Sequence, residues 1–110
     1  MNKVKSHKEV PLGEAILNAN SWDDGDVLLL CFDEIWDVNC QSLIATVDHY
    51  LKEDPEVILN QKKFEYVFLK SQIIEILGNS EIQLGRDLSQ EEALKAFLFY
   101  FDNDAFFDWS

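Results

Sequence analysis

Six consecutive apolar residues at positions 27–32 restrict the fold of this chain more than any other stretch does. The run is too short for a free helix, and Gly25 and acidic residues bound it. A buried β-strand fits this pattern best. A second strand is predicted at residues 64–69, which are β-branched and aromatic and have poor helix propensity. Residues 57–60 are expected to be a brief extended piece.

Apolar residues spaced by three and four predict helices over residues 11–19 and 40–52. A further helix is expected where Ser71 could act as its cap, and Gly78 would end or interrupt it. The clearest helix spans residues 90–103, because Ser89 and Glu92 have the spacing of a capping box. Its core-facing side is predicted to contain Phe97, Leu98 and Phe101. The aromatic tail at residues 104–110 is expected to dock onto the body or onto a partner.

These elements predict one small α+β domain, with a small sheet packed by about four helices and the C-terminal helix central. A chain of 110 residues with 47% hydrophobic residues has the size and composition for one core. Residues 1–10 are polar and basic, and we interpret them as a loose segment or a short edge element. The domain itself is predicted to occupy residues 11–110.

The formal net charge of −12 narrows the choice of partners. No Lys or Arg occurs between positions 9 and 51. Nucleic acid and anionic membranes are therefore excluded as expected partners, since both carry dense negative charge. The N-terminus lacks the apolar region of a secretory signal, and no stretch is long enough to span a bilayer. Two cysteines, Cys31 and Cys40, do not make a disulfide scaffold, and we expect a cytoplasmic, reduced protein.

The sequence contains no recognisable catalytic or metal-binding motif. His7 and His49 have no ligand residues at zinc-site spacing, and the glycines do not form a phosphate-binding loop. We therefore predict no cofactor, no metal and no enzymatic activity. A small enzyme that uses an Asp/Glu pair stays open as a rival and would require a concave pocket with a perturbed carboxylate.

Carboxylates beside aromatic residues are typical of a protein-binding face. Aromatic side chains supply buried anchor area, and carboxylates steer a basic partner and fix its register. If the two acidic patches of this chain converge in space, the hypothesis of a binding face gains. The candidate partner-binding residues are Asp23, Asp24, Asp26, Asp33, Glu34, Trp36 and Asp37, with Asp102, Asp104 and Asp108 as a second patch.

Two stretches, "WDDGDVLLLCFDEIW" and "SQEEALKAFLFYFDNDAFFDW", carry a family resemblance. With the small size and the acidic charge, they resemble the immunity proteins of bacterial toxin systems, especially those of contact-dependent growth inhibition. The resemblance implies a cytosolic inhibitor that binds one cognate toxin domain tightly, often a nuclease. It implies no catalytic residues.

The predicted function is therefore an immunity-type inhibitor that neutralises a basic toxin domain by steric and electrostatic occlusion. An alternative in the same class is an acidic adaptor or a nucleic-acid mimic that regulates another basic protein. A homodimer built on the aromatic tail is compatible with each of these functions.

Overall fold

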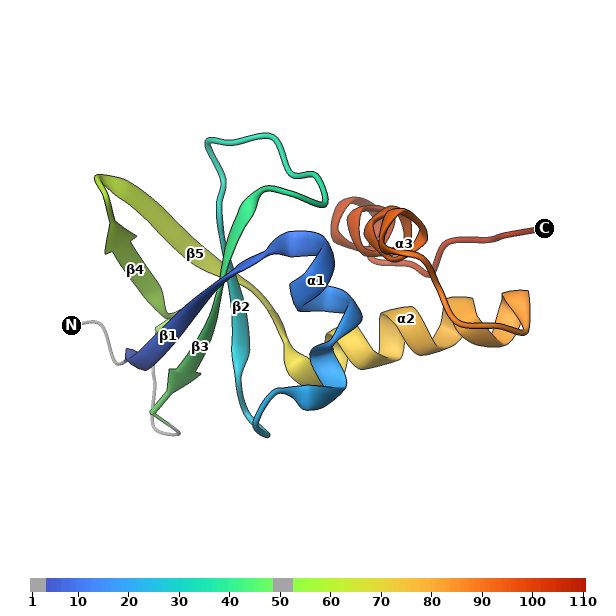
Figure 1. Ribbon diagram of the computed structural model, residues 1–110, viewed down its shortest axis with the longest axis horizontal. Helices are drawn as coiled ribbons and strands as arrows, with labels where there is room; N and C mark the ends of the chain where they lie inside the picture. The colour runs from blue at the N-terminus through green and yellow to red at the C-terminus, as the bar shows by residue number, and fades with distance from the viewer. Residues whose placement is uncertain (1–3, 49–52) are drawn as a thin grey trace.

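Five antiparallel strands form one curved sheet in the computed structural model, which describes residues 4–48 and 53–110 (Figure 1). The strand order across the sheet is β1-β3-β2-β5-β4. Three helices and a short 3-10 turn, η1, lie beyond one side of the sheet (Figure 1). The strands are β1 (Val4–Pro11), β2 (Val27–Cys31), β3 (Gln41–Val47), β4 (Glu56–Leu59) and β5 (Lys62–Leu69). The helical elements are α1 (Leu12–Leu17), η1 (Ala19–Ser21), α2 (Lys70–Leu84) and α3 (Gln90–Asn103).

Strand β2 is apolar throughout because both faces of the sheet are covered at its position. Leu28 and Leu30 face the helices and belong to the larger core. Leu29, on the opposite face, belongs to a second core whose buried members all come from strands β2 to β5. The sheet therefore curls over itself like half a barrel. The strand predicted from the apolar run is confirmed, ending at Cys31 rather than at Phe32.

The helix predicted over residues 40–52 is wrong, because residues 41–47 form strand β3. β3 pairs with β1 on one side and with β2 on the other. Its side chains alternate between the two cores: Ile44 faces the helices, whereas Leu43 and Ala45 face the smaller core. Because both faces of β3 are covered, its apolar residues do not alternate with polar ones. The spacings of three and four among Leu43, Ile44 and Val47 therefore match those of a helical face. Residues 49–52 of that predicted helix lie outside the described residues.

The prediction of about four helices is also wrong, although the α+β class holds, since the described residues contain three helices. Helix α2 begins at Lys70, where Gln72 Oε1 accepts a hydrogen bond from Leu69 N at 2.8 Å, so Ser71 is not its cap. It continues through Gly78 and ends at Gly85, whose φ of 71° lies in the left-handed region.

Helix α3 begins where the capping box predicted it. Ser89 Oγ accepts from Glu92 N at 3.2 Å, and Glu92 Oε1 accepts from Ser89 N at 2.9 Å. The helix packs on α1 and α2, and its Phe97 ring lies 5.6 Å from the Phe68 ring of β5.

The two ends of the described chain are both held against the body. Residues 4–11 form edge strand β1, which corresponds to the edge-element interpretation of the N-terminal segment. At the other end, Trp109 Nε1 donates to Ser80 Oγ at 2.8 Å, so the tail docks onto α2 as expected. No helix among residues 4–48 and 53–110 is long and apolar enough to cross a membrane.

Candidate functional site

The carboxylates on either side of the apolar run lie at opposite ends of strand β2. An extended strand rises about 3.3 Å per residue, so five residues separate its ends by about 17 Å. Asp23 and Asp24 precede the strand, whereas Asp33 and Glu34 follow it. The acidic residues that lie close together in the sequence therefore form two separate groups in the fold, one at each end of β2.

Asp26 serves the fold rather than the surface. Its side chain is buried, and its carboxylate accepts hydrogen bonds from Asp23 N at 3.1 Å and from Thr46 Oγ1 at 3.0 Å. Its neighbour Asp24 is fully exposed and pairs with Lys70 Nζ at 3.2 Å. The same Lys70 ammonium donates to the carbonyl of Trp22 at 2.6 Å. This end of β2 is thus tied to the start of α2, and Asp26 is not available to a partner.

At the other end of β2, the loop of residues 32–40 packs against helix α3. The Phe32 and Trp36 rings lie 5.4 Å apart, and each also meets Phe101 of α3, at 5.9 Å and 4.9 Å. Trp36 Nε1 donates to the carbonyl of Cys31 at 2.9 Å, which fixes the indole with its N–H satisfied. Figure 1 shows this loop reaching toward α3. Trp36 is therefore a rigid, half-buried member of an aromatic cluster.

This cluster continues along α3 into the C-terminal tail. Phe101 and Tyr100 both contact Phe68 of β5 beneath them, and Tyr100 meets Phe106 at 5.4 Å. The exposed fractions are 47% for Phe32, 39% for Phe101 and 37% for Phe106. We call the set Phe32, Trp36, Tyr100, Phe101 and Phe106 the aromatic row.

Exposed acidic residues adjoin members of the aromatic row in both segments that form it. The loop contributes Asp33, Glu34 and Asp37, while Asp102 and Asp104 follow Phe101 at the end of α3. Contacts of Phe101 with Phe32 and Trp36 join the two segments, so the loop carboxylates and the α3 carboxylates share one region. The two predicted patches therefore converge in part. Ile35, in the same loop, is 88% exposed and adds an unpaired apolar side chain.

Three of the acidic residues predicted to bind a partner have local roles as well. Glu34 pairs with Lys62 Nζ at 3.2 Å, and Asp37 Oδ1 accepts from Asn39 N at 2.9 Å. Asp108 Oδ1 accepts from Ser110 N at 2.9 Å, and hydrogen bonding to Ser110 lowers the pKa of the Asp108 carboxyl.

Asp108 stands apart from the aromatic row by its neighbours. The rings of Phe107 and Trp109, on either side of it, meet edge to face with their centres 4.7 Å apart. Lys95 Nζ lies 4.8 Å from the centre of the Phe107 ring. These contacts place that part of the tail against α2 and the Lys95 side of α3.

No group of three or more His, Cys, Asp or Glu side chains that could hold a metal occurs in the described part of the chain. Cys40, where the loop meets β3, is half-buried, and burial raises the pKa of its thiol, with Asp37 and Glu34 raising it further. A thiol of this kind is a poor nucleophile. The arrangement can instead supply apolar anchors and a negative rim to a basic protein.

Several members of this surface were not predicted as contact residues. Phe101 was predicted to be core because of its helical spacing, and nothing in that spacing separates it from buried Phe97. Phe32 was assigned to the buried strand, and Ile35 and Phe106 were not singled out as contacts. The acidic neighbours of Phe32 and Ile35 are the one signal in the sequence that could have marked them as surface residues.

The family model described as Domain of unknown function (DUF7716) matches residues 9–109 of the chain. A search of curated proteins and a search of solved structures each find no match.

Proposed function

Because this chain belongs to the family of domains of unknown function DUF7716, we propose its function from its own residues. The proposed function is that of an immunity-type inhibitor, which binds a basic toxin domain in the cytoplasm and neutralises it. The toxin domain is proposed to be a nuclease.

The aromatic row with its acidic surroundings is the observation that supports this proposal. Exposed Phe32 and Phe101 and the protruding Ile35 offer anchors that a partner can bury. Trp36 contacts the Phe32 ring edge to face, and Phe68 contacts the Phe101 ring in the same way. The exposed rings are therefore already fixed, so little side-chain freedom is lost on binding. A preorganised apolar patch with a charged rim has the composition of a protein–protein interface.

The charge of the chain favours a basic partner, and a nuclease is one class of basic partner. A nuclease must hold phosphates in a positive groove, and a strongly acidic protein can occupy that groove or cover its entrance. A net charge of −12 also accelerates encounter with such a partner. Arginine side chains of the partner could pair with carboxylates and stack on exposed rings together.

The test of this proposal begins with the tagged chain, recovered from its native cells at low salt and at about 0.5 M salt. The proposal expects one basic protein in near-stoichiometric amount, toxic when expressed alone and harmless when the chain is co-expressed. Recovery of many basic proteins that are all lost at the higher salt would contradict it, because that pattern indicates nonspecific charge attraction.

Two isoleucines then test the surface. Ile35→Ser should weaken binding by about tenfold or more, because it removes an anchor from the aromatic row. Ile82→Ser is the matched control, since Ile82 is 84% exposed, against 88% for Ile35, but lies on α2 away from the row. Equal affinity of the two variants would place the interface elsewhere.

A charge-matched pair separates steering from anchoring. The double variant D33N/D102N and the control D54N/D87N each remove two exposed carboxylates. The first should slow association and reduce its salt dependence more than the second does, because only the first lies beside the aromatic row. Identical association rates would mean that the net charge alone steers the partner.

A further inference from the structure

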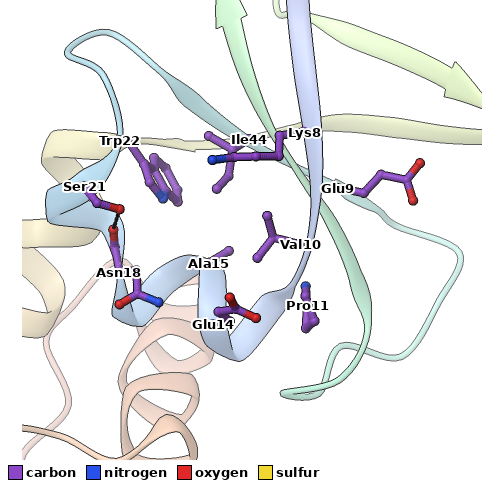
Figure 2. Close-up of a pocket in the computed structure, with 10 residues that line it drawn as sticks. All are labelled: Lys8, Glu9, Val10, Pro11, Glu14, Ala15, Asn18, Ser21, Trp22 and Ile44. Atoms are coloured by element: carbon purple, nitrogen blue, oxygen red, sulfur yellow. Dashed lines mark hydrogen bonds between the residues drawn. The ribbon is translucent and has the colours of Figure 1, made fainter.

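A pocket of about 360 Å³ lies between strand β1 and the segment formed by α1 and η1 (Figure 2). A second hollow of about 230 Å³ adjoins it and shares Lys8, Ser21, Trp22 and Ile44 with it. No residue of the aromatic row lines either space. The combined volume is in the range of small-molecule sites, and the region lies apart from the aromatic row.

Trp22 gives the pocket an unused hydrogen-bond donor. The side chain is only 7% exposed, and its Nε1 has no acceptor among residues 4–48 and 53–110. Trp36 and Trp109, by contrast, donate to the Cys31 carbonyl and to Ser80 Oγ. Figure 2 shows the nitrogen-bearing edge of the Trp22 ring on the side of Asn18 and Ala15. A buried N–H without an acceptor is unfavourable, and an acceptor on a ligand would satisfy it.

Two opposite charges also line the pocket without internal partners. Lys8 on β1 and Glu14 on α1 form no side-chain hydrogen bond or ion pair within the described part of the chain. Figure 2 shows Lys8 at one end of the pocket, reaching toward Trp22, and Glu14 at the other end. Glu9 is turned away, since its Oε2 accepts from Gln41 Nε2 at 2.7 Å.

Between these charges the wall is apolar. Ala15 and Ile44 are buried, and Val10 is half-buried beside them. A ligand that carries only a negative or only a positive charge would pair with only one of these two groups. An uncharged ligand would leave both groups without a partner. A ligand with both charges and an apolar middle complements all three parts of the pocket.

We propose that this pocket binds a small zwitterionic molecule whose ammonium and carboxylate groups are separated by an apolar body. The carboxylate accepts from Trp22 Nε1 and pairs with Lys8, while the ammonium pairs with Glu14 and donates to the Asn18 side-chain carbonyl. The apolar body lies over Ala15 and Ile44. Trp22 Nε1 is covered from solvent, so side chains around it must move when the ligand binds.

The test uses the full chain, labelled with ¹⁵N, and follows the indole N–H signals. The probes are ω-amino acids of increasing length: 4-aminobutyrate, 6-aminohexanoate and 8-aminooctanoate. We expect at least one of them to shift the Trp22 indole signal downfield in a saturable way, because that N–H gains an acceptor. The signals of Trp36 and Trp109 should stay in place, because their hydrogen bonds exist already. Trp22→Phe assigns the signal.

Hexanoate and hexylamine are the matched controls for 6-aminohexanoate, since each lacks one of the two charges. Each should bind at least about tenfold more weakly, because a hydrogen bond to a charged group is lost. Equal affinity of the three compounds would overturn the proposal by showing that only the apolar body is recognised. The absence of a saturable Trp22 shift with every ω-amino acid would overturn it as well.

Two lysine variants test the assigned geometry without touching the core. Lys8→Met should abolish the preference for the zwitterion over hexylamine, whereas Lys5→Met should keep it, because Lys5 lies on the same strand but does not line the pocket. Equal behaviour of the two variants would overturn the role of Lys8. The outcome does not depend on the inhibitor function, because no toxin is present and Ile35→Ser should leave binding of the probe unchanged.

Discussion

Gly13 lets the loop of residues 32–40 pack closely against α1 and α3, and replacing it by alanine tests that arrangement. A Cβ at this position would lie 2.6 Å from Gln90 Oε1 and 2.8 Å from Val38 Cβ. The Gln90 side chain is long and can move away. Val38 cannot move so easily, because its carbonyl accepts from Gly13 N at 2.9 Å, and the Cys40 carbonyl accepts from Leu12 N at the same distance.

Two opposing effects set the change in the free energy of unfolding caused by Gly13→Ala. Alanine is favoured over glycine in a helix by about 0.5–1 kcal/mol, whereas overpacking a closely packed site costs about 1–3 kcal/mol. Gly13→Ala should therefore lower the free energy of unfolding by about 1 kcal/mol. At Gly78, within α2, no heavy atom of the described residues lies within 4 Å of an added Cβ. Gly78→Ala should raise the free energy of unfolding by about 0.5–1 kcal/mol.

Urea unfolding of the two variants and of the wild type measures both changes. The same chemical substitution should have opposite signs at the two sites. Gly13→Ala should also shift the indole N–H signal of Trp36, because the loop that carries it must move. If Gly13→Ala proves as stable as Gly78→Ala, the close packing of α1, the loop and α3 is refuted, and with it the rigid support of the aromatic row.

Three further changes have defined outcomes. Asp26→Ala should lower the free energy of unfolding by about 2 kcal/mol in urea, because a buried carboxylate with two hydrogen bonds is lost; an unchanged value would mean those bonds contribute nothing. Arg86 holds the pKa of Glu92 at about 2, so Arg86→Gln should raise that pKa toward 4.5 in an NMR titration. Because the folded pKa is depressed, this stabilisation is present above pH 4.5 and is lost as the pH falls toward 2. The Arg86→Gln variant should show a smaller dependence, because the hydrogen bonds from Ser89 also lower the pKa and remain in place. Trp109→Phe should cost about 1 kcal/mol by leaving the Ser80 hydroxyl unpaired, and adding Ser80→Ala should recover most of it.

The sequence could predict those elements whose signals are local. Ser89 and Glu92 mark the start of α3, and the structure has both hydrogen bonds of the capping box there. The apolar run marks β2 because six apolar residues in succession exceed what one helical face provides. Such signals depend on neighbours within a few residues, which the sequence displays directly.

Strand β3 shows where local signals fail. Leu43, Ile44 and Val47 have the spacing of a helical face, yet the segment pairs with two strands. The decisive interaction is with β1, which the sequence presents as a polar, basic stretch with no strand alternation. Burial on both faces of β3 follows only from the curl of the sheet, and that curl depends on contacts among residues far apart in the chain.

The candidate site was predictable in composition but not in geometry. The acidic and aromatic character of residues 32–37 and of the C-terminal segment is visible in the sequence, whereas their meeting at Phe101 is a tertiary contact. The same limit explains Asp26, whose carboxylate is indistinguishable from those of Asp23 and Asp24 until Thr46 is placed beside it.

The two tryptophans at the ends of β2 show how similar sequence contexts serve different purposes. Each stands among carboxylates, yet the indole of Trp36 is satisfied by a backbone carbonyl and the indole of Trp22 is not. A satisfied and packed ring is a suitable fixed support for a protein interface, because binding requires no new partner for its N–H. An indole N–H in a pocket that has no acceptor is stabilised by any ligand that supplies one. We therefore expect partner binding and ligand binding to occur at opposite ends of one strand, where each can be removed by substitution without the other.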